Sequence, residues 1–289
     1  MGFPRASRFV DVACALLIAA MMLLGAPACA KRAPDGTRLP KVAKPKEPPK
    51  PPKDRYSKLS TQEVFDLAMK RMEQKSYFKA RELFQKVLGR QDATPALISK
   101  VHLGLADAYF LDGGLLNLAE ALSRYTNFLT FYPNDARADY AQYQLGLCYL
   151  RQAANPDRDQ AQAKKALAEL TKIQNTYPNS EYVTVAAKDV SKARELLAEH
   201  DFRIGYFYFR RKAYTGAVQR LREVLEAYPA YSRKDRLYLL LGQSLVGLKK
   251  EDEGRLYLEK LVAEFPTSRY ADEARDVLKR PVQTANGGP

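Results

Sequence analysis

The chain has 289 residues, enough for one or two domains, and its hydrophobic fraction of 46% is ordinary for a globular protein. The net charge of +14 is uneven, because residues 1–58 hold 12 basic and 4 acidic residues. The rest of the net charge is modest and is spread over helices, so it does not indicate nucleic-acid binding. The three cysteines (Cys14, Cys29 and Cys148) exclude a disulfide framework.

A secretory signal peptide is predicted over residues 1–28. Arg5 and Arg8 precede an apolar run, Val12–Leu24, and small residues follow it. The 13 residues of this run are too few to cross the roughly 30 Å hydrocarbon core of a bilayer as a helix. A basic start, a short apolar run and small residues at its end are typical of a cleaved signal peptide.

Cys29 is the predicted lipid attachment site. The small residue Ala28 directly before it resembles the bacterial lipobox, in which the cysteine becomes the acylated first residue of the mature chain. Ordinary cleavage after Ala28 or Ala30 is the alternative. Acyl chains on Cys29 would hold the protein at a membrane, because each buried methylene contributes about 0.8 kcal/mol.

Residues 29–58 are predicted to form a lipid-anchored tether. Seven prolines lie between Pro34 and Pro52, interleaved with lysines. Proline prevents helix formation, like charges repel, and the segment has too few apolar side chains to build a core. We expect an extended spacer that holds a folded domain away from a membrane.

A recurring pattern predicts five tetratricopeptide repeats (TPRs), and therefore an all-α protein in which five helix pairs stack as an α-solenoid. In the second helix of each repeat a small residue comes four positions before a bulky one, and a proline follows. The small residues are Ala80, Ala121, Ala166, Ala217 and Gly254, the bulky ones are Phe84, Tyr125, Leu170, Leu221 and Leu258, and the prolines are Pro95, Pro133, Pro178, Pro229 and Pro266. The first helices have small residues at Ala68, Ala106, Gly146, Gly205 and Gly242. Small residues let the partner helix approach closely, and the proline ends the second helix.

The spacing between repeats predicts one long helix over residues 181–210. Gly205 follows Pro178 by 27 positions, whereas the corresponding distance after Pro133 is 13. The 14 extra residues make about four helical turns at 3.6 residues per turn, which keeps the apolar face in phase. The predicted TPR domain, 59–279, therefore has repeats 1–3 at 59–180, the long helix at 181–210, repeats 4–5 up to 279, and a flexible tail at 280–289.

The first helices are expected to present a groove for a peptide. Methionine and aromatic side chains on an exposed groove make an adaptable binding surface. The candidate residues are Phe65, Met69, Met72, Leu103, Phe110, Tyr140 and Tyr143, with Lys100 as a basic rim residue for a terminal carboxylate. The alternative is that these side chains form the core between repeats.

Nothing in the sequence indicates an enzyme or a cofactor. The two histidines, His102 and His200, are expected on different helices. The chain has no H-E-x-x-H zinc motif, no G-x-S-x-G nucleophile motif and no glycine-rich phosphate loop. We expect a binding scaffold with no metal and no catalytic residue.

Four longer stretches carry a family resemblance. They are RYTNFLTFYPNDARADYAQYQLGL (124–147), DRDQ (157–160), YPNSEY (177–182) and LAEHDFRIGYFYFRRKAYTGAVQRLREVLEAYP (197–229). With the signal peptide, the lipidation cysteine and five TPRs, they make the chain resemble the BamD family, lipoproteins of the outer-membrane β-barrel assembly machinery. One departure is Lys212, which stands where that family usually has a glycine.

The resemblance implies a non-catalytic scaffold, lipid-anchored in the outer membrane and facing the periplasm. Its C-terminal repeats would bind the periplasmic part of a BamA-like barrel protein, and Arg220 matches a family position at that contact. The N-terminal repeats would take the signal segment of unfolded outer-membrane proteins. Accessory lipoproteins would be further partners. A solvated helix face is the alternative for Arg220.

Two other classes of protein share parts of this pattern. One is a periplasmic TPR adaptor of the TolA-binding cell-division coordinator type, which normally has no lipid anchor and carries an N-terminal coiled coil. The other is a cell-wall-associated TPR lipoprotein.

Overall fold

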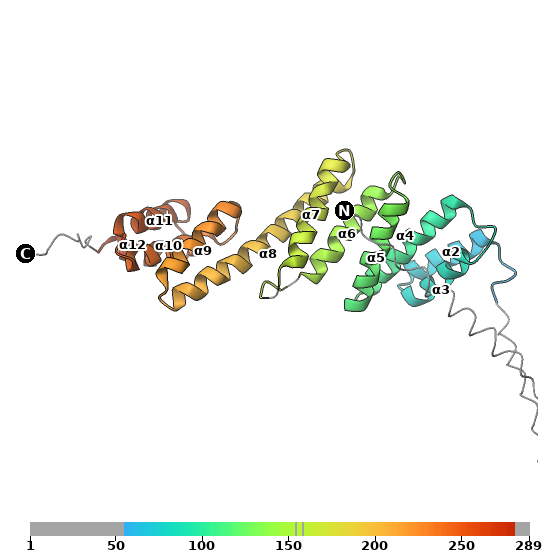
Figure 1. Cartoon of the computed structure of the whole chain (residues 1–289), viewed down its shortest axis with the longest axis horizontal. Coiled ribbons are helices and arrows are strands. Elements are labelled where there is room, and N and C mark those ends of the chain that lie inside the picture. Colours follow the sequence, from blue (N-terminus) through green and yellow to red (C-terminus); the bar gives the residue numbers. More distant parts are fainter. Residues whose placement is uncertain (1–54, 154, 158, 281–289) are drawn as a thin grey trace, which may run out of the picture. The chain divides into compact units, whose positions relative to one another are not determined.

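The computed structural model describes residues 55–153, 155–157 and 159–280 (Figure 1). These residues form eleven α-helices and no strand, which confirms the predicted all-α class. The helices are α2 (Thr61–Glu73), α3 (Tyr77–Leu88), α4 (Pro95–Asp112), α5 (Leu115–Phe131), α6 (Ala138–Gln152), α7 (Ala161–Thr176), α8 (Tyr182–Arg210), α9 (Tyr214–Ala227), α10 (Lys234–Gly247), α11 (Glu251–Glu264) and α12 (Ala271–Leu278). The predicted signal peptide, Cys29 and most of the predicted tether and tail lie outside the described residues.

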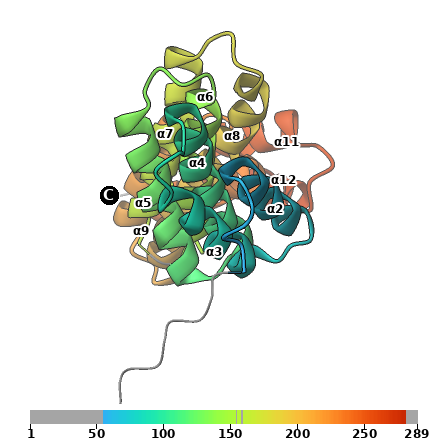
Figure 2. The ribbon, with the colours of Figure 1, turned by 90° about the vertical axis from the view of Figure 1, so that its right-hand side faces the viewer.

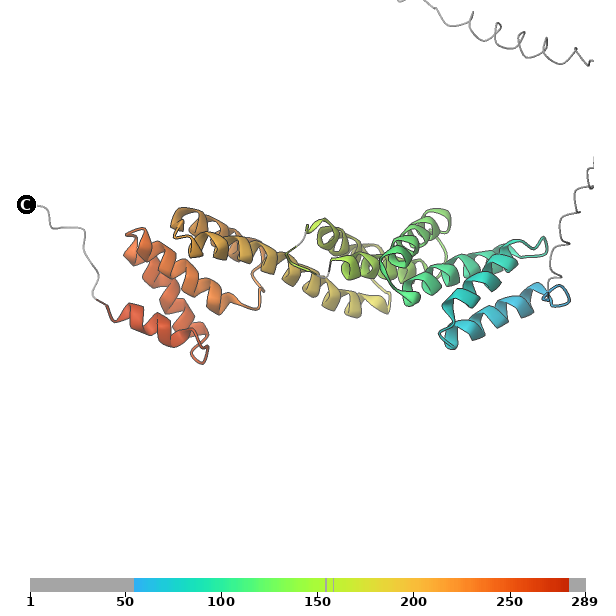
Figure 3. The same ribbon diagram turned by 90° about the horizontal axis from the view of Figure 1, so that it is seen from below.

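The helices pack in antiparallel pairs that follow one another along the chain. The pairs are α2–α3, α4–α5, α6–α7, α8–α9 and α10–α11, and α12 packs against α11. First helices of neighbouring pairs also touch: α2 with α4, α6 with α8, and α8 with α10. Figure 3 shows the same succession from below, and Figure 2 looks along the series of pairs. The described residues are the predicted stack of five TPR-type helix pairs.

The stack begins at a capped helix. Ser60 is the N-cap of α2, and its hydroxyl accepts a hydrogen bond from the backbone N–H of Glu63. The Glu63 carboxylate in turn accepts from the Ser60 backbone N–H at 2.7 Å. This reciprocal capping box satisfies donors that the first turn of a helix leaves without partners.

Close contact between paired helices depends on the glycine–leucine pattern. A Cβ atom placed on Gly146 would lie 2.5 Å from Leu170 Cδ2, and one on Gly242 would lie 2.7 Å from Leu258 Cδ2. Both leucines are buried. The bulky residue of the second helix therefore fills the space that the small residue of the first helix leaves, as the sequence pattern predicts.

Four of the five repeat prolines follow the end of a second helix, but Pro95 does not. α3 ends at Leu88, and Pro95 is the first residue of α4, where Thr94 is the N-cap. The interpretation of Pro95 as a late helix-ending proline is therefore wrong. Proline is favoured at the first position of a helix because the N–H that it lacks would have no partner there.

The helix α8 has 29 residues and packs against both α7 and α9. It begins one residue after the start of the long helix that the spacing predicts, and it ends at the same residue. The inserted segment between α6 and α7 lies against it: His200 Nδ1 is 2.7 Å from the Pro156 carbonyl oxygen, and the Arg203 guanidinium pairs with Asp157. These contacts tie the insertion to the C-terminal half of α8.

Candidate functional site

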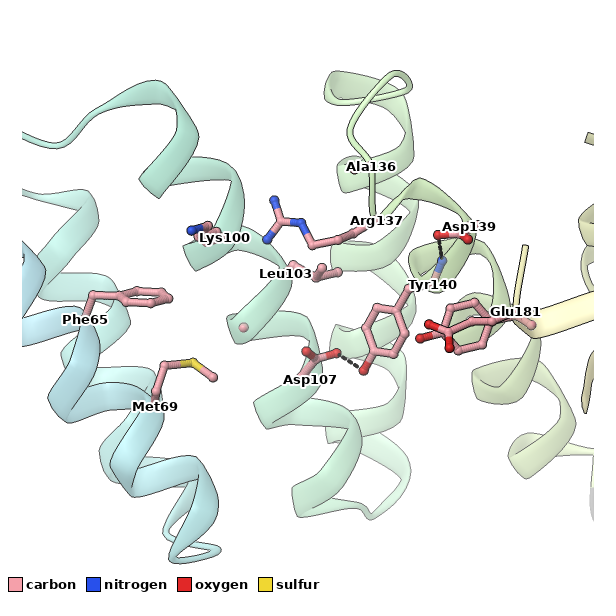
Figure 4. Close-up of a pocket in the computed structure, with 12 residues that line it drawn as sticks. Phe65, Met69, Lys100, Leu103, Asp107, Ala136, Arg137, Asp139, Tyr140 and Glu181 are labelled. Atoms are coloured by element: carbon pink, nitrogen blue, oxygen red, sulfur yellow. Dashed lines mark hydrogen bonds between the residues drawn. The ribbon is translucent and has the colours of Figure 1, made fainter. Parts of the chain in front are cut away.

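A cavity of about 420 Å³ lies between the first helices of the N-terminal repeats (Figure 4). It is lined by residues of α2 and α4, of the turn before α6 and its first turn, and of the start of α8. The lining residues are Phe65, Met69, Lys100, Leu103, Gly104, Asp107, Ala136, Arg137, Asp139, Tyr140, Glu181 and Tyr182. We call this cavity the first-helix pocket.

Helical spacing brings the walls of the pocket together. Phe65 and Met69 are four residues apart on α2, and Lys100 and Asp107 are seven apart on α4, so each pair shares one face of its helix. Gly104 lies between the α4 residues, and a Cβ atom on it would be 2.7 Å from the Phe84 ring. The glycine therefore lets α4 lie close to Phe84.

One wall of the pocket is apolar. The Phe65 ring lies 5.9 Å from the buried Phe84 ring at 52°, which holds it in place beside the pocket. Met69 is 41% exposed and Leu103 is buried at 5%. Figure 4 shows Phe65 and Met69 projecting from α2 toward α4. This wall can receive an apolar or aromatic side chain.

A second wall is basic. Arg137 donates two hydrogen bonds to the Asp135 carboxylate, from Nε to Oδ1 at 2.9 Å and from Nη2 to Oδ2 at 2.7 Å. Its Nη2 also donates to Ser99 Oγ. The hydrogen bonds from Arg137 lower the pKa of Asp135 to about 2. Lys100 is exposed and has no ion pair within the described residues. Lys100 is therefore the basic group of this wall that is available to a ligand carboxylate.

A carboxylate lies on the opposite side. Asp107 Oδ1 accepts hydrogen bonds from the hydroxyls of Tyr125 at 2.6 Å and Tyr140 at 3.0 Å. Burial raises the pKa of Asp107 to about 6, although both hydroxyls and Arg137 oppose the shift. Burial and the Asp107 charge raise the pKa of Tyr140, so its hydroxyl remains a donor.

The rim near α8 is acidic and aromatic. Asp139 accepts a hydrogen bond from Ser180 Oγ at 2.6 Å, and Glu181 is exposed. The Tyr182 ring lies 5.6 Å from the Tyr140 ring. The pocket therefore offers an apolar wall for an apolar side chain and a cation for a carboxylate, while its own carboxylates suit N–H groups or a basic side chain.

The structure brings five of the eight predicted groove residues to this pocket: Phe65, Met69, Lys100, Leu103 and Tyr140. Phe110 does not line it, because it is only 4% exposed and lies in the core under the Arg151 guanidinium, 3.7 Å from the ring centroid. The prediction that Phe110 faces the groove is therefore wrong.

Two further predicted residues lie beside the pocket and do not line it. Met72 packs against the core of the first helix pair. Tyr143 donates a hydrogen bond to Asp189 Oδ2 at 2.9 Å, and its ring stacks on Tyr182 at 5.4 Å. Tyr143 therefore connects α6 to α8 behind the pocket.

Sequence reasoning missed two kinds of pocket residue. Asp107 carries a detectable signal, because it lies seven positions after Lys100 on the same face of α4. Arg137 and Glu181 lie directly before helices, in turns. Helical periodicity does not report on turns, so the sequence pattern gave no sign of them.

Arg220 lies on α9, remote in sequence from the pocket. Its side chain is 47% exposed and its Nη1 lies 2.9 Å from Glu223 Oε2, one turn along the helix. An exposed pair of this kind is weak, because both charges remain solvated. The guanidinium can therefore turn to another carboxylate at little cost.

The described part of the chain has neither a metal-binding cluster nor a membrane-spanning helix. No cluster of three or more His, Cys, Asp or Glu side chains there could hold a metal ion. None of the helices described is long and apolar enough to cross a membrane.

Comparisons with known proteins identify the family. A family model described as YfiO, an outer membrane lipoprotein, matches residues 57–255. The outer membrane protein assembly factor BamD of Caulobacter vibrioides is 29% identical over 160 residues, which are 55% of this chain and 52% of that protein. BamD of Buchnera aphidicola is 24% identical over 204 residues, 66% of this chain and 81% of that protein.

The chain thus aligns with about half the length of the Caulobacter relative and with more of the Buchnera one. Among solved structures, that of MamA is 17% identical and covers 72% of this chain and 96% of its own, with a TM-score of 0.31. Since the family model extends from before α2 into α11 and matches well over half of the residues, this chain belongs to the BamD/YfiO family of outer membrane lipoproteins.

Proposed function

We propose that this chain is a non-catalytic scaffold of the outer-membrane β-barrel assembly complex. The observation that carries the proposal is the family match over residues 57–255. The relatives named outer membrane protein assembly factor support the same role. In this proposal Cys29 anchors the chain in the outer membrane, and the helix pairs face the periplasm.

In the proposed role the first-helix pocket binds the terminal segment of an unfolded barrel protein. Support comes from the juxtaposition of an apolar wall with an unpaired cation. A terminal aromatic side chain would pack against Phe65 and Met69, and the carboxylate that follows it would pair with Lys100. Asp139 and Glu181 would favour backbone N–H groups or a basic side chain further along the segment.

A peptide-binding measurement tests this half of the proposal. A labelled peptide ending in phenylalanine is titrated with the full chain, and Lys100→Glu should weaken binding at least tenfold. Lys260→Glu, the same change on the exposed face of α11, is the matched control and should leave the affinity unchanged. Amidating the peptide should remove the difference between wild type and Lys100→Glu. Equal affinity of both variants for the free-acid peptide contradicts the assignment.

The C-terminal repeats are proposed to hold a BamA-like barrel protein through a surface that includes Arg220. Its exposure and its weak local ion pair support this, because an arginine fork can bind a partner carboxylate with two hydrogen bonds. Accessory lipoproteins and unfolded barrel proteins are the other proposed partners.

Co-purification from outer membranes tests the Arg220 contact. Arg220→Glu should reduce recovery of the barrel protein at least tenfold, while peptide binding at the first-helix pocket stays intact. Lys188→Glu, an exposed position on α8, is the control for added negative charge. Unchanged recovery with Arg220→Glu would remove this residue from the contact.

A further inference from the structure

Large apolar side chains are exposed mainly at one kind of turn. The described residues contain nine large hydrophobic side chains that are exposed, and five of these lie in or beside the turns that join the two helices of the first, second and fourth pairs. These five are Phe78 (65% exposed), Leu111 (49%), Leu115 (75%), Leu116 (86%) and Phe207 (52%). We call residues 74–79, 111–116 and 207–212 the turn edge.

The turn edge is also basic. It contains Lys75, Lys79, Arg210, Arg211 and Lys212, all exposed and none in an ion pair within the described residues. Its single acidic residue, Asp112, is paired with Arg81 at 2.7 Å. The sequence has no acidic residue from 202 to 222. The free charge of the edge is therefore entirely positive.

Apolar and basic side chains are adjacent at these turns. The Arg211 guanidinium lies 4.5 Å from the centroid of the half-exposed Phe207 ring. Phe78 stands next to Lys79 in the first turn of α3. Gly113 and Gly114, with φ of 73° and 80°, place Leu115 and Leu116 at the tip of the second pair. Such a mixture is costly to leave in water but suits a boundary between charged headgroups and hydrocarbon.

The three turns lie on the same side of the described fold. In Figure 1 the α2–α3, α4–α5 and α8–α9 turns follow the lower edge of the ribbon, and the connections between the N-terminal pairs lie on the upper edge. The α6–α7 connection, with Asp159 and the ion-paired Asp157, lies on the same edge. A surface that touches all three turns therefore meets this connection as well as the ends of the first helices. The first-helix pocket is formed by residues nearer the middle or the start of α4 and α6, such as Lys100 and Tyr140, so it stays open.

We propose that the turn edge is a membrane-contact surface for anionic phospholipid. The leucine and phenylalanine side chains enter the boundary between headgroups and acyl chains, and the unpaired lysines and arginines bind the phosphates. Charge complementarity selects this occupant, because the edge offers only cations beside its apolar side chains. The inference rests on the outer-membrane location proposed above, and it adds a second contact to the anchor on Cys29. Two weak membrane signals together hold a protein more firmly than one.

Lipid quenching in vesicles tests the proposal. The mature chain is purified from outer membranes and reconstituted in vesicles that contain nitroxide-labelled lipid, with an environment-sensitive dye on Leu116→Cys, Phe207→Cys or Gln91→Cys. Gln91 is exposed in the α3–α4 connection, away from the turn edge, and is the control. Native Cys148 is buried, and burial raises the pKa of its thiol to about 12, so it does not take up the dye.

In vesicles containing phosphatidylglycerol, dye at positions 116 and 207 should be quenched at least twofold more than dye at position 91. The difference should shrink at least twofold in purely zwitterionic vesicles, and also in the triple variant Arg210→Glu, Arg211→Glu, Lys212→Glu. Equal quenching at the three positions overturns the proposal. The proposal is also overturned if Leu116→Asp leaves the lipid quenching at position 207 unchanged but abolishes co-purification of protein partners from outer membranes. That result would mean that the edge is a protein interface. Flotation of the unlabelled chain with the vesicles reports the anchor separately, so loss of anchoring is distinguishable from failure of the turn edge.

Discussion

Asp107 lies in the first-helix pocket with its carboxylate against two tyrosine hydroxyls. Burial raises its pKa from 3.8 to about 6. The unfolded chain therefore loses this proton at a lower pH than the folded chain does. Folding becomes less favourable as the pH rises from about 4 to 6, and the cost persists above that range.

Replacing the Asp107 carboxylate by an amide should remove this cost. Asp107→Asn keeps an oxygen that accepts from Tyr125, so urea unfolding at pH 8 should show a gain in stability of up to about 3 kcal/mol. At pH 3, below both the unfolded pKa of 3.8 and the folded pKa of about 6, the wild-type carboxyl is largely protonated in both states, so the gain should nearly disappear. A gain of the same size at both pH values would show that the charge of Asp107 is not responsible.

Gly242 is a residue whose lack of a side chain is needed for helix packing. A Cβ atom there would lie 2.9 Å from the Gly254 backbone oxygen and 2.7 Å from Leu258 Cδ2, and the backbone oxygen cannot move alone. Gly242→Ala should lower the free energy of unfolding by about 1–3 kcal/mol, in spite of the better helix propensity of alanine.

Gly89→Ala is the matched control for that prediction. Gly89 is the C-cap of α3 with φ of −79°, and the nearest atom to a new Cβ is 3.6 Å away. The same substitution there should be neutral or stabilise by up to about 1 kcal/mol. Thermal denaturation of both variants measures the two changes in stability. We expect Gly242→Ala to lower the melting temperature and Gly89→Ala to leave it unchanged or raise it.

Three first helices, α2, α8 and α10, end at tight turns in which a lysine has a positive backbone φ. Lys75, Lys212 and Lys249 have φ of 55°, 59° and 63°, the left-handed region that favours glycine. Each follows a first helix, and the next residue donates its N–H back to that helix, as Ala213 does to the Tyr208 carbonyl at 3.0 Å. This is the Schellman ending of a helix with a lysine in the glycine position.

Lys212→Gly should therefore stabilise the fold by about 1 kcal/mol, because glycine pays no Cβ penalty in that conformation. Lys188→Gly, on an exposed face inside α8, should cost about 1 kcal/mol for the opposite reason. Chemical denaturation of the two variants measures both changes. Destabilisation by Lys212→Gly would mean that the lysine side chain makes a contribution larger than its backbone cost.

The elements show what the sequence could and could not predict. Five small–bulky pairs were enough to place the helix pairs, because that spacing is a packing requirement. Pro95 was misinterpreted, because a proline is compatible both with the position after the end of one helix and with the first position of the next. Phe110 was misplaced in the groove because it lies seven residues after Leu103, on the same face of α4. Helical period alone does not tell which side chains on a face are covered by the neighbouring helix, and the pocket residues in turns leave no periodic trace.

At the scale of the whole molecule, the two proposed binding surfaces lie apart along one series of helices. The first-helix pocket is lined by the first three pairs and by the start of α8, and Arg220 lies on α9. α8 packs against helices of both groups, and the α6–α7 insertion is tied to it through His200 and Arg203. Because each pair contacts its neighbours, the two surfaces share one continuous stack.

The most direct test of the scaffold role is affinity purification of the full-length chain from solubilised outer membranes, with bound proteins identified by mass spectrometry. We expect near-stoichiometric recovery of a BamA-like barrel protein, which is lost with Arg220→Glu and kept with Lys188→Glu. Recovery of cell-wall synthases or a TolA-type protein, with no barrel-assembly protein, would contradict it.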